Sequence, residues 1–314
     1  MTGPKAADWI DWIRAGRVPK VGRMSLSPML SPKGRLIGDF TIARLAEEEF
    51  QLTASFGAQG YHLRWFWDHL PEEGVEIENV SLKRIGFQIA GPRARDLLAK
   101  VTYEDVSTEA FPFMAVKRMG VGLSDAIVQR VTYTGDLGYE IYVPADEQVA
   151  LYEVLAEAGE EFGLTPFGMR AMMSLRLEKS FGSWMREFKP DYTPEETGLD
   201  RFVAYNKPAD FIGKAAVLKE KAAGVTRKLS TFVVDALDAD VHGDEPIWKN
   251  GKVIGFVTSG GYAHYVGKSV ALGFTPPEMI EDGGQFEIEI LGEMRPARMV
   301  LDPLLDPMAE RMRG

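Results

Sequence analysis

Two aspartate–arginine pairs with the same spacing are the first candidates for chemistry in this chain. Asp39 and Arg44 follow one apolar segment, and Asp125 and Arg130 follow another, with the partners five residues apart in each case. A fixed carboxylate can stabilise a nearby positive charge or accept a proton. Because the pair occurs twice, a structural role is the competing interpretation, and Asp125 needs no catalytic function.

The repeated pair belongs to a longer repeat. Gly3-Pro4 and Gly91-Pro92 each open a helical pattern, and the offset between copies is 88 residues at the glycine and 86 at the aspartate. Two copies of this length predict a duplicated α+β unit and not a solenoid, which needs three or more short repeats. A strand-like run, residues 84–90, precedes the second copy, whereas only two residues precede the first. We therefore expect the first copy to be truncated at its N-terminus.

Composition excludes several kinds of site. The chain has 314 residues, no cysteine, four histidines and a net charge of −10. The lack of cysteine excludes disulfides and cysteine nucleophiles, and the negative charge argues against a nucleic-acid partner. His62 and His69 would share a helix face, but no third ligand lies near them, so a packed amphipathic helix is favoured over a metal site. With no 18-residue apolar run and no leader pattern, we expect a cytoplasmic protein without a membrane partner.

Periodicity and turn signals predict the elements that position these residues. The expected helices cover residues 4–15, 59–70, 92–102, 145–162 and a segment from Thr165-Pro166 to about 180. The expected strands lie in residues 35–55, 75–90 and a hairpin over 126–143. In the helix at 145–162, Val149, Tyr152, Leu155 and Phe162 form the expected apolar stripe. After Lys228, short strands with glycine turns predict a separate β-barrel or sandwich.

Two further segments carry polar or aromatic residues that invite a functional interpretation. Glu178 falls late in its expected helix, where the helix dipole disfavours an anion, and it lies on a partly apolar face. Tyr133, Tyr139 and Glu140 lie in the hairpin, where a simple turn would explain the pattern. Trp184 is explained equally well by core packing.

Taken together and in this order, five segments resemble the aminomethyltransferase (glycine-cleavage T-protein) superfamily. They are residues 29–45, 134–142, 174–184, 197–203 and 255–262. The resemblance spans nearly the whole chain and points to the folate-binding C-terminal half of sarcosine and dimethylglycine dehydrogenases. It implies a folate-binding α+β body in residues 1–225, built from two intertwined repeats near 3–45 and 91–131, and a C-terminal β-barrel domain in residues 226–314.

The resemblance also implies tetrahydrofolate as cofactor and one-carbon transfer as the reaction. A methylene or aminomethyl group from a methylated amine, such as sarcosine or dimethylglycine, would pass to the reduced pterin. A flavin-containing oxidoreductase domain or subunit is the implied partner, because this chain has no Gly-x-Gly-x-x-Gly pattern after a strand. Two alternatives stay open: a stand-alone tetrahydrofolate-dependent demethylase or methyltransferase, and an inactive folate-binding fragment.

Site residues follow from the same resemblance. Asp39 matches the catalytic carboxylate of the family, which would stabilise the positive charge at the reacting carbon. Glu178 matches the pterin-binding glutamate, because a carboxylate can accept two neighbouring ring donors at once. No metal is implied. The residues expected to contact the cofactor are Glu178, Tyr133, Tyr139, Glu140 and Trp184.

Overall fold

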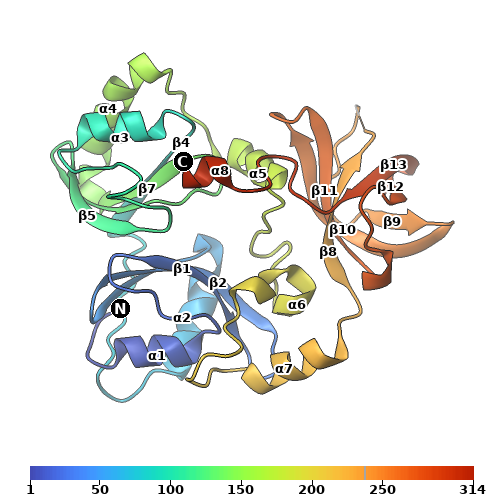
Figure 1. Cartoon of the computed structure of the whole chain (residues 1–314), viewed down its shortest axis with the longest axis horizontal. Coiled ribbons are helices and arrows are strands. Elements are labelled where there is room, and N and C mark those ends of the chain that lie inside the picture. Colours follow the sequence, from blue (N-terminus) through green and yellow to red (C-terminus); the bar gives the residue numbers. More distant parts are fainter. Residues whose placement is uncertain (237) are drawn as a thin grey trace. The chain divides into compact units, whose positions relative to one another are not determined.

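A computed structural model describes residues 1–236 and 238–314 (Figure 1). These residues form two compact units. The first unit contains Met1–Leu26, Phe40–Phe167 and Ala309–Gly314, and the second contains Ser27–Asp39 and Gly168–Met308. Helices and antiparallel strands occur together in both, so the expected α+β class is confirmed. The domain boundary expected near residue 225 stays a prediction, because the two compact units divide the chain at other positions.

The N-terminal part of the chain forms a helix, a three-stranded sheet and a second helix, drawn in blue in Figure 1. The sheet order is β1-β2-β3. These elements are α1 (Ala6–Ile13), β1 (Met24–Leu30), β2 (Leu36–Ala46), β3 (Glu49–Thr53) and α2 (Gln59–Asp68). Helices α1 and α2 agree with the sequence-based helices, and β2 and β3 agree with the strands expected in 35–55, whereas β1 was not predicted.

The next part forms a four-stranded antiparallel sheet of order β4-β7-β6-β5. Its elements are β4 (Arg84–Ala90), α3 (Ala94–Val101), β5 (Val116–Val121), β6 (Ser124–Gln129), β7 (Gly138–Pro144) and α4 (Gln148–Gly159). One face of the sheet packs against α3 and α4 in an apolar core that includes Ile89, Leu97, Val128, Ile141 and Leu155. Because strand side chains alternate, the other face carries a different set of residues.

The duplication is visible in the backbone of two helices. Helices α1 and α3 each have eight residues and begin three positions after a glycine of positive φ, at +127° for Gly3 and +129° for Gly91. The Ala6 N–H donates to Gly3 O and the Ala94 N–H to Gly91 O, both at 3.0 Å. At Gly3 a Cβ would lie 2.4 Å from the carbonyl oxygen of Gly74, so a larger residue does not fit.

The C-terminal strands close into a six-stranded barrel of order β10-β11-β8-β13-β12-β9, which confirms the expected β-barrel (Figure 1). The strands are β8 (Lys228–Val234), β9 (Pro246–Lys249), β10 (Lys252–Ala263), β11 (Lys268–Thr275), β12 (Gln285–Ile290) and β13 (Glu293–Val300). Its interior is filled by side chains that include Phe232, Ile247, Val257, Ile288 and Met299. The short strand β9 was not predicted from the sequence.

Three further helices belong to the second unit: α5 (Met169–Glu178), α6 (Pro194–Thr197) and α7 (Lys214–Ala223). The expected helix start at Thr165-Pro166 is wrong, because α5 begins after an extended Gly168 with no side-chain cap. Strands were expected over residues 75–90, but within that range only β4 (Arg84–Ala90) forms. A short C-terminal helix, α8 (Glu310–Arg313), belongs to the first unit.

The expected apolar stripe of the helix at 145–162 is also wrong in part. Helix α4 buries Leu151 and Leu155, which are four residues apart and therefore share a face. Val149 is 65% exposed because it lies on the opposite side of the helix, and Tyr152 is 49% exposed because it lies on the flank of the buried face.

Candidate active site

Asp39 lies in the part of β2 that belongs to the second unit. Its side chain is half-buried, so it keeps some accessible surface, yet protein atoms surround most of it. This burial raises the pKa of the Asp39 carboxyl to about 6, against the effect of a hydrogen bond with its own backbone. A poorly hydrated carboxylate interacts strongly with a positive charge placed beside it.

The repeated aspartate is in a different environment. Asp125, in β6, is exposed. Partners five residues apart on a strand face opposite sides, and neither Asp39 with Arg44 nor Asp125 with Arg130 forms an ion pair in the described chain. Arg44 forms its ion pair with Glu47 instead, and Arg130 donates to the carbonyl oxygen of Phe111. The repeat therefore does not conserve an aspartate–arginine contact.

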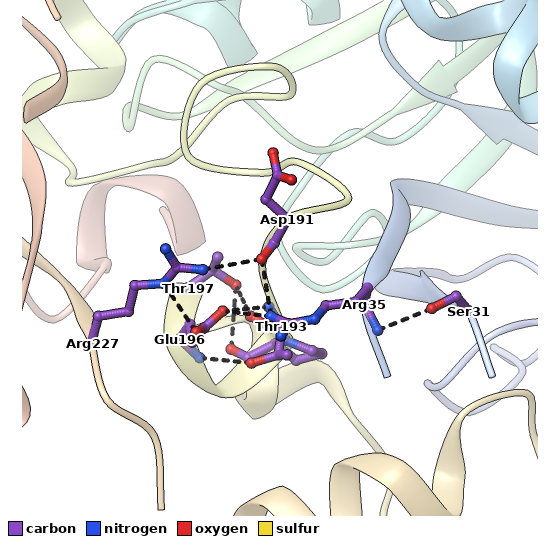
Figure 2. A network of polar contacts seen from close by, with 8 residues as sticks. Ser31, Arg35, Asp191, Thr193, Glu196, Thr197 and Arg227 are labelled. Atoms are coloured by element: carbon purple, nitrogen blue, oxygen red, sulfur yellow. Dashed lines mark hydrogen bonds and ion pairs between the residues drawn. The ribbon is translucent and has the colours of Figure 1, made fainter. Parts of the chain in front are cut away.

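A polar network holds the start of β2, three positions before Asp39 (Figure 2). Arg35 Nη1 donates to the carbonyl oxygen of Asp191 at 2.9 Å and to Glu196 Oε2 at 3.3 Å. The Leu36 N–H donates to Tyr192 O at 2.9 Å. The strand that carries Asp39 is thus bonded to residues 191–196.

Glu196 is the centre of this network (Figure 2). With Thr193 it forms a capping box at the start of α6, in which the Thr193 N–H donates to Glu196 Oε2 at 2.9 Å. Arg227 donates through Nε to Glu196 Oε1 at 3.0 Å and through Nη2 to Asp191 O at 3.1 Å. Two guanidinium groups therefore share one buried carboxylate, and this arrangement fixes the segment against which β2 begins.

Glu178 is the last residue of α5 and has no exposed surface. Its Oε1 accepts a hydrogen bond from the Tyr265 N–H at 2.7 Å, and its backbone oxygen accepts one from the Leu305 N–H at 2.9 Å. Its Oε2 is buried and has no partner among the described residues. The preceding Leu177 packs in an apolar cluster of the barrel strands, which fixes the position of Glu178.

Glu187 shows what a structural buried carboxylate looks like in the same unit. Its oxygens accept from Arg176 Nη1 at 3.1 Å, from the Ser183 N–H at 2.8 Å and from Thr258 Oγ1 at 2.6 Å. Because both oxygens are satisfied, Glu187 holds α5 to the barrel and leaves nothing for a ligand. Trp184, in the same loop, is half-buried and forms a backbone bridge to Phe188.

The hairpin residues divide between the two faces of β7. Tyr139 is fully buried in the core, its ring packs against Phe111 with centroids 5.7 Å apart, and its hydroxyl lacks a partner in the described chain. Glu140 points to the opposite face and is half-buried. Burial raises the pKa of Glu140, against the effect of the hydrogen bond that its Oε2 accepts from Tyr142 Oη at 2.7 Å. Tyr133 is half-buried in the turn before β7.

The structure therefore places the sequence-based site residues in two groups. Asp39, Glu178 and Trp184 belong to the second unit. Tyr133, Tyr139 and Glu140 belong to the first.

Sequence analysis missed the two arginines and Glu196 that hold β2, although Thr193-Pro-Glu-Glu196 is a capping-box pattern that could have revealed part of the network. Within residues 1–236 and 238–314, no cluster of three or more acidic or histidine side chains is arranged to hold a metal ion. In the same residues, no helix has the length and apolar character needed to cross a bilayer.

Two domain families match the chain. Residues 1–207 match the GCVT N-terminal domain, and residues 227–306 match the glycine cleavage T-protein C-terminal barrel domain. The chain therefore belongs to the glycine-cleavage T-protein family, and the resemblance inferred from its motifs is confirmed. Aminomethyltransferases of this family are enzymes that use tetrahydrofolate.

Individual relatives come from two groups. The chain is 40% identical over 307 residues to the mitochondrial dimethylglycine dehydrogenase of Homo sapiens, covering 96% of this chain and 36% of that protein. It is 32% identical to an aminomethyltransferase of Natranaerobius thermophilus, covering 96% of this chain and 82% of the relative. It thus spans about a third of the dehydrogenase and most of the aminomethyltransferase.

A solved structure has the same fold. Aminomethyltransferase T of the glycine cleavage system from Bartonella henselae superposes with a TM-score of 0.87 at 24% identity, covering 98% of this chain and 83% of that one.

Proposed function

We propose that this chain transfers one-carbon units from a methylated amine to tetrahydrofolate. The observation that carries the proposal is Asp39, a half-buried carboxylate of raised pKa on an anchored strand, in a chain of the aminomethyltransferase family. A carboxyl with a pKa of about 6 is largely ionised at pH 7 and can still take up a proton near that pH. Asp39 would stabilise the cationic carbon of the donor and accept the proton that the attacking amine loses.

Tetrahydrofolate fits the carboxylates of this chain. The amino group and adjacent ring N–H of a pterin form a two-donor edge, which a carboxylate accepts. The half-buried Glu140 and the buried Glu178 each have an oxygen to offer, because in each only one oxygen is engaged by a donor. When bound, the cofactor supplies the nitrogen atoms that receive the one-carbon unit.

Between these two carboxylates, we assign the pterin edge to Glu140. Its side chain keeps accessible surface, whereas Glu178 has none, so Glu140 is the more accessible of the two carboxylates. Glu140 also lies directly opposite two polar residues, Gln88 and Gln129, on the neighbouring strands. Leu177, which precedes Glu178, packs in an apolar cluster. Glu178, the stronger candidate from the sequence, remains the second choice.

The donor follows from the relatives. The 40% identity to a dimethylglycine dehydrogenase supports an N-methylated amine such as dimethylglycine or sarcosine, so that the net reaction is a demethylation. Oxidation of the amine to its cationic imine needs an electron acceptor, and a flavin-containing oxidoreductase domain or subunit would provide it. This chain would then accept the activated carbon.

The test combines the purified chain with tetrahydrofolate and dimethylglycine, with and without an added flavin dehydrogenase. We expect 5,10-methylenetetrahydrofolate, detected by mass spectrometry, only when the dehydrogenase is present. Product from the chain alone would establish the stand-alone demethylase instead. Absence of both product and tetrahydrofolate binding by calorimetry would contradict the proposal.

A further inference from the structure

One face of α1 and a proline just after α2 line a hollow that the proposed chemistry does not use. The hollow has a volume of about 290 Å³, and its lining residues are Lys5, Asp8, Trp9, Trp12 and Pro71. The first four follow the spacing i, i+3, i+4 and i+7, which places side chains on one face of a helix. All five residues belong to the first unit, so the hollow is formed within one compact body.

Two indole rings form the aromatic walls of the hollow. Trp9 is nearly buried and held in place, because its Nε1 donates to His69 O at 2.7 Å and its ring centroid lies 5.8 Å from that of Phe66. Trp12 is 40% exposed, and its ring centroid lies 5.8 Å from that of His69, which in turn stacks against Trp65 at 4.2 Å. The ring of Trp12 is thus supported by the protein and still open to a ligand.

The charges around the hollow favour a cation. Asp8 is exposed and forms no ion pair within residues 1–236 and 238–314, whereas Lys5 Nζ lies 2.9 Å from Glu73 Oε1 and is neutralised by it. Residues 5–12 and 71–73 together contain four carboxylates and one ammonium group. Such an excess of one sign attracts ligands of the opposite sign. The dipole of α1 would explain Asp8 in its first turn, but it does not explain two indoles beside that carboxylate.

We propose that this hollow binds a methylated ammonium cation, with its methyl groups against the rings of Trp9 and Trp12 and with Asp8 as counter-ion. The face of an aromatic ring attracts a cation, and indole does so more strongly than the other aromatic side chains. The methyl groups add apolar area that the rings can cover, which an unmethylated ammonium group lacks. The ligand class is therefore a tertiary or quaternary amine. This site is separate from Asp39, which belongs to the other unit, so the inference does not depend on the proposed function.

Two probes of the same shape separate charge recognition from apolar contact. The first is choline, and the second is the neutral alcohol in which a tert-butyl group replaces its trimethylammonium group. Both are titrated into the purified chain at constant ionic strength, and binding is measured by saturation-transfer NMR on the methyl signals. We expect wild type to bind choline about tenfold more tightly than the alcohol, because only choline interacts with the aromatic faces and with Asp8 through a charge.

Variants of the lining residues assign the site. Trp12→Leu keeps an apolar side chain without a ring, so it should bind choline about fivefold more weakly and lose most of the preference. Trp12→Phe keeps an aromatic face and should retain a preference for choline. Asp8→Asn should weaken choline binding and leave binding of the alcohol unchanged. Trp67→Leu is the matched control, because Trp67 is 60% exposed on α2 and does not line the hollow, and it should bind both probes like wild type.

Three results would overturn the inference. Equal affinity of wild type for the two probes would show that the hollow is only an apolar surface. A choline preference that survives in both Asp8→Asn and the ring-free variant Trp12→Leu would place the binding elsewhere on the chain. Absence of choline binding would exclude the site outright. Tetrahydrofolate binding should be the same in all these variants, so the proposed function is tested separately.

Discussion

Replacing Asp39 by asparagine should stabilise the protein above pH 6. The carboxyl of Asp39 has an ordinary pKa of 3.8 and a pKa of about 6 in the folded chain, because burial disfavours its charged form. Between these values the folded state binds more protons than the unfolded state, so stability falls as pH rises through this window. Above pH 6 the full cost of the buried charge is present, and Asp39→Asn removes it.

The magnitude follows from the shift. A change of roughly two pKa units, at about 1.4 kcal/mol each, corresponds to about 3 kcal/mol. Because Asp39 keeps some accessible surface, water offsets part of this cost, and we expect a gain of about 1–3 kcal/mol at pH 8. Below pH 3.8 both side chains are neutral, so the two proteins should be equally stable.

The assay is urea unfolding of wild type and Asp39→Asn at a series of pH values from 4 to 8. The difference between the two proteins should be near zero at pH 4, rise through pH 5 and 6, and level off above. Asp125→Asn is the control for the substitution itself, because Asp125 is exposed and its replacement should leave the free energy of unfolding nearly unchanged. A constant or falling difference for Asp39→Asn would refute the reasoning that Asp39 is a carboxylate buried at a cost to stability.

Three further predictions test the remaining assignments. Glu140→Gln should weaken tetrahydrofolate binding by roughly 2–4 kcal/mol, because the amide places a donor against the donors of the pterin. Glu178→Gln should weaken binding less in the same calorimetric titration. A larger loss for Glu178→Gln than for Glu140→Gln would assign the pterin edge to Glu178. Arg35→Gln should lower kcat about tenfold, or about 1.4 kcal/mol, with little change in KM for tetrahydrofolate, because the start of β2 loses its anchor. Lys228→Gln is the control and should keep the wild-type kcat, because its ion pair joins α6 to β8 without touching β2. Equal losses in the two variants would show that the network only stabilises the fold. Glu187→Gln should lower the free energy of unfolding by about 3–5 kcal/mol, because it leaves a buried guanidinium without its counter-ion, and an unchanged urea midpoint would contradict that role.

The fold was largely predictable because its signals are local and repeated. Gly3 and Gly91 open two helices with the same backbone, and the pattern of short strands and glycine turns after Lys228 is that of a closed barrel. What the sequence did not determine was which face of an element is buried. Val149 and Tyr152 have helical spacing and are nonetheless exposed, because the position of α4 on the sheet selects Leu151 and Leu155.

The site was less predictable, because it depends on pairing between distant segments. Asp39 and Asp125 look alike in sequence, and only the structure gives them different burial. Gln88 and Gln129 carried no motif, and they lie opposite Glu140 only through the register of three strands that are separated along the chain. Glu178 stays a predicted ligand, and only the structure shows that it is fully buried with Oε2 unpaired among the described residues.

The most direct test of the central claim compares one-carbon transfer by Asp39→Asn and Asp125→Asn. The rate of 5,10-methylenetetrahydrofolate formation is measured at saturating tetrahydrofolate, with dimethylglycine and the added flavin dehydrogenase. The account predicts a loss of a hundredfold or more for Asp39→Asn, on the order of 3 kcal/mol in activation free energy, with folate affinity nearly unchanged. Asp125→Asn should react at the wild-type rate. Equal rates for the two variants would contradict the claim, because they would show that Asp39 is only the structural aspartate of the repeat.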